Sequence, residues 1–127
     1  MSKISQTAVI MAIVYGLMYS GQSFASSISV DEVFHITTPI TVNDVKRRFG
    51  PFMKGHGPYV WYKVTDDPDW EIWFFVRVDG SGSYDDDSGI VLIGLVKEDD
   101  ENIMKVLWPA GISSKDGIRY LSELYGE

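Results

Sequence analysis

The middle of the chain carries apolar residues at the spacing of β-strands. Residues 59–64 (YVWYKV) are rich in β-branched and aromatic side chains, and residues 70–79 (WEIWFFVRVD) alternate along their length. Residues 90–96 (IVLIGLV) are apolar on both faces, as in a central strand, and a shorter run follows at 103–108. Because polar turns separate these runs, the pattern predicts three or four strands that pair antiparallel in succession.

Two further segments have the end signals of amphipathic helices. Thr41 can cap the first helix, with Asp44 three residues later, and Gly50 and Pro51 end it. Ser113 can cap a second helix near the C-terminus. The apolar stripe of that helix consists of Ile118, Leu121, Leu124 and Tyr125. The order of elements predicts an α+β fold: a two-layer sandwich in which a three- to four-stranded antiparallel sheet follows one helix and precedes a C-terminal helix.

The first 25 residues have the layout of a cleavable secretory signal. Lys3 supplies a positive start, residues 8–19 form an apolar run without charge, and small residues stand at Ser23 and Ala25. We expect cleavage between Ala25 and Ser26. A retained membrane anchor is disfavoured because twelve residues of helix span about 18 Å, whereas the hydrocarbon core is about 30 Å thick.

Residues 26–127 contain no repeat and no low-complexity linker, which predicts a single α+β domain after the signal peptide 1–25. Residues 26–34 fit a mobile leader, a short strand or one helical turn. The chain has no cysteine, which excludes disulfides and an acylated lipoprotein anchor. We therefore expect a periplasmic or secreted protein with no membrane anchor after cleavage.

Acidic residues outnumber basic ones by 18 to 11, so the formal net charge is −7. Phosphate binding needs clustered Lys and Arg, and this balance therefore argues against a nucleic-acid partner. It is compatible with steering toward a basic protein partner and also with simple solubility.

Aromatic dipeptides and tripeptides mark a family resemblance within residues 42–96. The first predicted helix ends in the tripeptide 49–51 (FGP), and the strands carry 61–62 (WY) and 73–75 (WFF). This stretch resembles the small outer-membrane assembly lipoproteins of the SmpA/OmlA type and, more distantly, the fold of proteinaceous β-lactamase inhibitors. The chain departs from the lipoproteins in lacking the acylated cysteine and in having an extra strand and helix. The resemblance implies a non-enzymatic scaffold whose surface binds other proteins, and it carries over no binding residue.

Catalytic candidates are few. Thiol nucleophiles are excluded, no G-x-S-x-G motif occurs, and the two histidines, His35 and His56, lack the spacing of a zinc site. Glu71 is the acidic residue inside an alternating strand, where pairing with Arg77 or Lys63 is the simpler interpretation. We therefore expect no enzyme, no catalytic residue and no cofactor, and the alternative is a small hydrolase that uses carboxylates or His56.

The polar connection 79–87 (DGSGSYDDD) begins like a calcium loop, with candidate ligands Asp79, Asp85 and Asp87. The EF-hand requires glycine at the sixth position and glutamate at the twelfth. Here those positions are Tyr84 and Ile90. A solvated hairpin tip is therefore the alternative to a weak calcium site.

Large rings on both faces of residues 70–79 are the strongest functional signal. If the C-terminal helix does not cover Trp73 and Phe75, they form an exposed patch of the kind that binds proteins. Arg77 would then be a polar anchor, and Trp61 and Tyr59 would extend the patch. These residues predict a non-enzymatic, exported protein-binding domain with a protein partner of unknown identity. One alternative is an inhibitor or immunity protein that occludes a basic toxin or a wall-degrading enzyme, and the other is the small hydrolase.

Overall fold

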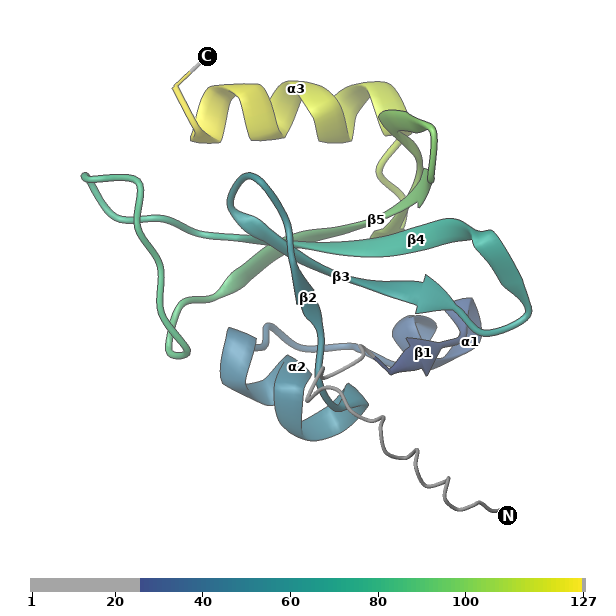
Figure 1. Ribbon diagram of the computed structural model, residues 1–127. Coiled ribbons are helices and arrows are strands. Elements are labelled where there is room, and N and C mark those ends of the chain that lie inside the picture. Colours follow the sequence, from purple (N-terminus) through teal and green to yellow (C-terminus); the bar gives the residue numbers. More distant parts are fainter. Residues whose placement is uncertain (1–25, 127) are drawn as a thin grey trace.

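The computed structural model describes residues 26–126, which form an α+β fold around one open, mixed sheet of six strands (Figure 1). The strand order is β1-β3-β4-β5-β6, and β2 pairs with β3 beside this path. The predicted signal peptide lies outside the described residues. None of the helices described is long and apolar enough to span a membrane.

The elements in chain order are β1 (Ser27–Ile28), α1 (Val30–Phe34), α2 (Val42–Phe49), β2 (Met53–Lys54), β3 (Tyr59–Val64), β4 (Asp67–Val76), β5 (Ile90–Lys97), β6 (Asp100–Trp108) and α3 (Ser114–Leu124). Strands β3 to β6 are the predicted antiparallel succession. The turn between β3 and β4 is shorter than the gap between the predicted strands 59–64 and 70–79, because Val64 already pairs with Asp67.

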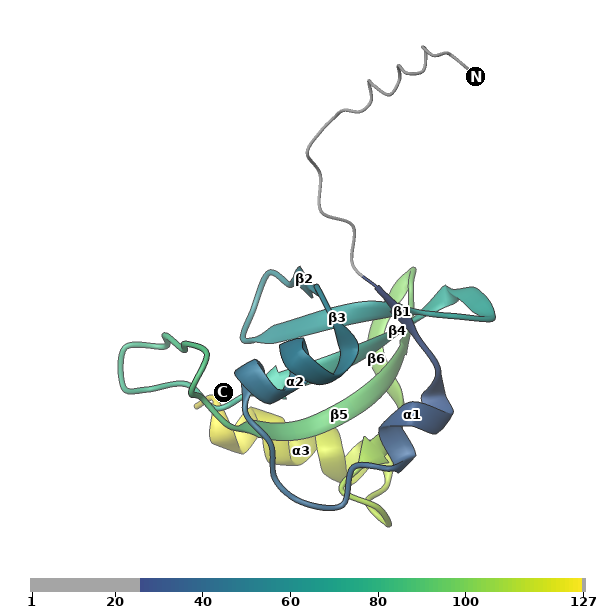
Figure 2. The same cartoon turned by 90° about the horizontal axis from the view of Figure 1, so that it is seen from below.

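Two details of the predicted architecture need correction. The sheet has six strands and is mixed, because β1 joins β3 in parallel and β2 joins it antiparallel. Helices also lie on both faces: α1 and α2 on one, α3 on the other (Figure 1, Figure 2). The physical reason is that β4 and β5 are buried along most of their length and both of their faces need cover. The arrangement therefore has three layers.

The face under α1 and α2 is closed by aromatic and β-branched side chains. Phe74 has no exposed surface and lies between Phe49 and Tyr62, with ring centroids 5.7 Å away in each case. The Tyr62 hydroxyl donates a hydrogen bond of 2.8 Å to the carbonyl of Gly50, which joins β3 to the end of α2. At the start of α2, Thr41 and Asp44 form the predicted capping box.

The opposite face is covered by α3, which begins at the predicted cap Ser113. A Cβ atom on Gly117 would lie 2.7 Å from Cγ2 of Val106, so the absence of a side chain lets α3 approach the sheet closely. At the other end of α3, the Tyr125 hydroxyl donates a hydrogen bond of 2.8 Å to the carbonyl of Val76. The helix is thus attached to the sheet at both ends.

Candidate functional site

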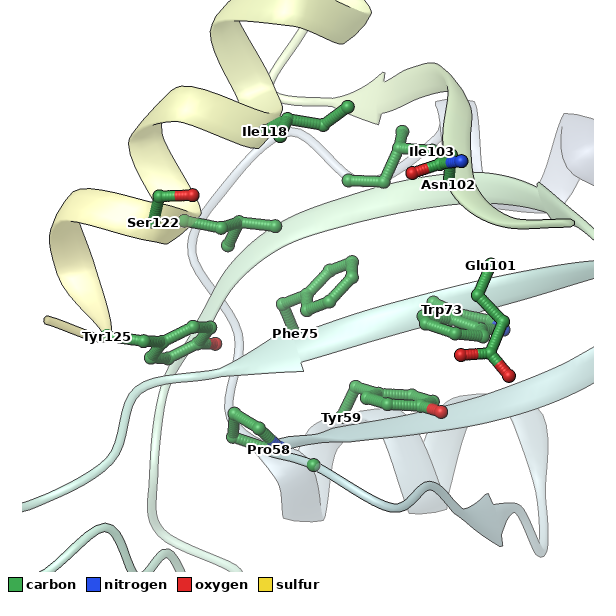
Figure 3. A pocket seen from close by; sticks show the side chains of 12 residues that line it. Pro58, Tyr59, Trp73, Phe75, Glu101, Asn102, Ile103, Ile118, Ser122 and Tyr125 are labelled. Carbon is green, nitrogen blue, oxygen red and sulfur yellow. The ribbon is translucent and has the colours of Figure 1, made fainter. Parts of the chain in front are cut away.

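A groove of about 250 Å³ runs between α3 and the sheet (Figure 3). Its floor comes from β3 and β4, one wall comes from α3, and Glu101, Asn102 and Ile103 of β6 line it as well. The lining is largely apolar and aromatic, which is typical of surfaces that bind other molecules.

The floor follows from the register of β3 and β4. Tyr59 pairs with Phe75 and Trp61 with Trp73, so the strand period of two places all four rings on the face of the sheet that carries α3. Tyr59 and Trp73 are stacked, with centroids 3.9 Å apart and planes 9° from parallel. Phe75 lies 5.7 Å from Tyr59 in a tilted arrangement. The rings form a packed aromatic surface along the groove.

The wall from α3 combines buried and exposed apolar side chains. Leu121 is buried, whereas Ile118, one helical turn earlier, is 40 % exposed although it lines the groove. Tyr125 closes the end of the wall (Figure 3). Burial raises the pKa of the Tyr125 phenol above its ordinary value, so its hydroxyl keeps the proton that it donates to Val76.

A second hollow of about 350 Å³ adjoins the groove and shares Tyr59, Trp73 and Glu101 with it. Further lining residues are Met53, Lys54, Gly55, His56, Trp61, Glu71 and Glu98. The two depressions are therefore parts of one continuous surface, apolar beside α3 and acidic toward the turn between β5 and β6.

Glu71 is the buried charge of this surface, with 8 % of its area exposed. Its Oε1 accepts a hydrogen bond of 2.8 Å from Nε1 of Trp73. Its Oε2 lies 3.7 Å from Nζ of Lys63, and that ammonium is 3.1 Å from Glu98. The prediction that Glu71 pairs with a nearby basic residue is consistent with this contact.

The negative charges also act on Tyr59. Burial is the main cause that raises the pKa of the Tyr59 phenol, and the carboxylates of Glu101 and Glu71 raise it further. A hydrogen bond with the backbone of His56 opposes this shift. The ring therefore stays neutral and keeps its stacking surface at ordinary pH.

Four of the five predicted binding residues come together in this surface, but not as the exposed patch that was expected. Trp73 and Phe75 are each only 8 % exposed. Trp73 is covered by the stacked ring of Tyr59, and Phe75 lies against Leu121 in the cluster under α3. Tyr59 and Trp61 are half-buried. The aromatic side chains form the floor of a groove rather than a projecting surface.

Arg77 is not part of this surface. It is exposed just beyond the end of β4 and lines a separate depression with Asp79 and Asp87. Two residues that line the groove, Ile118 and Glu101, were not predicted as binding residues from the sequence. Ile118 belongs to the predicted apolar stripe and Glu101 to a polar turn between two predicted strands, and neither pattern indicates which strand lies opposite.

The candidate calcium loop is held by its own hydrogen bonds. Oδ1 of Asp79 accepts hydrogen bonds from Ser81 and Ser83, which lower the pKa of the Asp79 carboxyl, the Ser81 side chain contributing most. Oδ1 of Asp85 accepts one from the backbone of Asp87. Across residues 26–126, no group of three or more acidic or histidine side chains is placed to hold a metal ion.

The histidines lie apart from each other. His35 is exposed and its Nε2 is 3.8 Å from Asp31. His56 lies at the rim of the second hollow, which Glu71 also lines. Among the described residues, no ion pair joins His56 to a carboxylate.

Comparisons of the chain with protein-family models, with curated proteins and with solved structures gave no match.

Proposed function

We propose that this chain is a non-enzymatic, exported domain that binds a protein partner through the groove between α3 and the sheet. The carrying observation is the groove whose packed aromatic floor consists of Tyr59, Trp73 and Phe75 and whose wall includes the exposed side chain of Ile118. Aromatic anchors in a partly desolvated groove are the usual centre of protein recognition. A periplasmic or secreted location belongs to this proposal.

An extended segment of the partner fits this surface better than a compact small molecule does. The groove continues into the second hollow through three shared residues, so the surface is elongated and open. Small-molecule sites are deeper and enclose most of their ligand. The scaffold role that the SmpA/OmlA-type resemblance implies, and the inhibitor or immunity role, are two versions of this proposal, and the identity of the partner separates them.

The test uses two variants of α3 that are matched in exposure. Ile118 lines the groove and is 40 % exposed, whereas Tyr120 is 39 % exposed and lines neither depression. The full chain carries an affinity tag behind a flexible C-terminal linker and is used to capture partners from a native envelope extract. We expect Ile118→Ser to lose a stoichiometric protein that the wild type and Tyr120→Ser both retain. Equal capture by all three proteins would contradict the proposal.

A small hydrolase is the second candidate, because His56 and Glu71 line the same hollow. It predicts that His56→Ala abolishes the biological phenotype of the chain, whereas the binding proposal predicts no change. A complementation assay of the deletion strain with both proteins separates the two functions.

A further inference from the structure

We propose that the second hollow receives an arginine side chain from a basic partner segment; this inference rests on the proposed function and specifies the chemistry of the partner. The hollow combines three aromatic rings, Tyr59, Trp61 and Trp73, with the carboxylates of Glu71, Glu98 and Glu101. A guanidinium group is the side chain that can both stack on aromatic faces and donate to carboxylates.

The first observation is a buried carboxylate oxygen that is ion-paired with Lys63 but accepts no hydrogen bond from it. Among the described residues, Oε1 of Glu71 has a donor in Trp73, but Oε2 has only the Lys63 ammonium at 3.7 Å, beyond hydrogen-bond distance. Lys63 is engaged elsewhere, at 3.1 Å from Glu98 and 3.2 Å from the carbonyl of Pro68. A buried carboxylate oxygen normally has a donor, and a ligand in the hollow would supply one.

The second observation is the charge of the lining. The lining carries three carboxylates, Glu71, Glu98 and Glu101, against one ammonium group, that of Lys54. Glu101 forms no ion pair with any described residue. Even when Lys63 is counted beside Glu71, one negative charge remains in excess. The net charge of −7 on the whole chain would steer a basic segment toward this site.

The third observation is that the aromatic wall already accepts a cation. Nζ of Lys63 lies 5.8 Å from the ring centroid of Trp61, within the range of a cation–π contact. Trp73 lines the same hollow, although Tyr59 is stacked on its ring and only 8 % of its area is exposed. A planar guanidinium would stack on the half-buried ring of Trp61, whereas an ammonium group would act as a point charge.

The test reads the indole Nε1–H signals of Trp61 and Trp73 by NMR during titration of the full chain. The probe is N-acetyl-arginine N-methylamide, and the matched neutral control is the citrulline analogue. We expect saturable shifts of both indole signals with the arginine probe, and at least fivefold weaker binding of the citrulline and lysine analogues. Absence of a saturable shift, or equal binding of the citrulline analogue, would overturn the assignment of the site. Equal or tighter binding of the lysine analogue would overturn the preference for arginine.

Two charge variants distinguish the contribution of the acidic hollow to binding of the arginine probe from the contribution of the general surface charge. Glu101 is exposed, so Glu101→Gln keeps the fold intact, and we expect it to weaken the arginine probe at least fivefold. Glu123→Gln on the exposed face of α3 removes the same charge outside both depressions and should leave the affinity unchanged. Equal affinities of the two variants would contradict the proposal. The titration needs no partner, so its outcome is independent of the capture experiment. If capture depends on Ile118 but the arginine probe does not bind, the arginine site alone is refuted. If the arginine probe binds but capture does not depend on Ile118, the proposed function alone is refuted.

Discussion

The two faces of the sheet bury neighbouring residues of the same strands in different ways. On the face of α1 and α2, Phe74 and Tyr62 are fully enclosed between helices and sheet. On the face of α3, Phe75 and Trp73 are covered by a single packed helix and by Tyr59, and a groove remains beside them. The first face holds the fold together, whereas the second face leaves aromatic surface within reach of a ligand.

Replacing Phe74 or Phe75 by alanine is expected to have the largest effect on the free energy of unfolding. Both are phenylalanines on β4 and point to opposite faces. Phe74→Ala leaves an enclosed cavity and should cost about 3–5 kcal/mol of the free energy of unfolding. Phe75→Ala opens its space into the groove, where water can enter, and should cost about 1–2 kcal/mol less because the cavity term is reduced. Urea unfolding of both variants measures the difference, and equal losses would mean that the α3 face is as closed as the other.

Gly117→Ala tests how closely α3 must lie on the sheet. Alanine improves helix propensity by about 1 kcal/mol. Its Cβ, however, would lie 2.7 Å from Val106 and 3.3 Å from Leu92, and overpacking costs about 1–3 kcal/mol. We expect a net loss of up to about 2 kcal/mol, measured by urea unfolding. The control is Gly80→Ala, because nothing lies within 4 Å of a Cβ at Gly80, and a stabilised Gly117→Ala protein would show that the approach of α3 is loose.

Each face also has a phenol that donates a hydrogen bond to the backbone, and the corresponding Tyr→Phe variants give the smallest effects. Tyr62 donates to Gly50 beneath α2, and Tyr125 donates to Val76 beside α3. Loss of either bond should cost about 0.5–1.5 kcal/mol at pH 7. Thermal unfolding of Tyr62→Phe and Tyr125→Phe measures both losses.

The same phenols predict the pH dependence of stability. Burial raises the pKa of Tyr62 and Tyr125 in the folded chain above the value of about 10 of an exposed tyrosine. The folded state therefore holds these protons more tightly, and the stabilisation is complete below pH 10 and is lost as the pH rises above it. We expect the melting temperature of the wild type to fall between pH 10 and 12, and to fall less in either Phe variant. An identical fall in all three proteins would assign the effect to other groups.

Elements with local signals could be predicted from the sequence. The bounds of β3, the capping residues Thr41 and Ser113 and the end of α2 at Gly50 are as expected, because strand period, caps and glycine act within a few residues. The short strands β1 and β2 were not predicted as part of the sheet, since they are held by pairing with β3. An amphipathic stripe likewise shows that a helix has a face to bury, but not which face of a sheet it will cover.

The same limit applies to the candidate site. Tyr59, Trp61, Trp73 and Phe75 could be predicted to share a face because the strand period and the turn fix their register. Arg77 was predicted to join them as a polar anchor, but it lies just beyond the end of β4 at Val76 and lines neither depression. Ile118 lines the groove because α3 docks on this face, and Glu101 lines it because β6 follows the turn after β5. Both placements depend on packing between segments that are far apart in the sequence.

The attachment of α3 at both ends has a consequence for the thermodynamics of binding. Gly117 places one end directly on Val106, and the Tyr125 hydroxyl fixes the other end to β4. The groove is thus preformed, and the conformational entropy lost on binding would be mainly that of the partner, because no helix or loop within residues 26–126 would have to become ordered. Binding would therefore retain most of the free energy gained from contact with the rings, and even a short, flexible segment could achieve useful affinity.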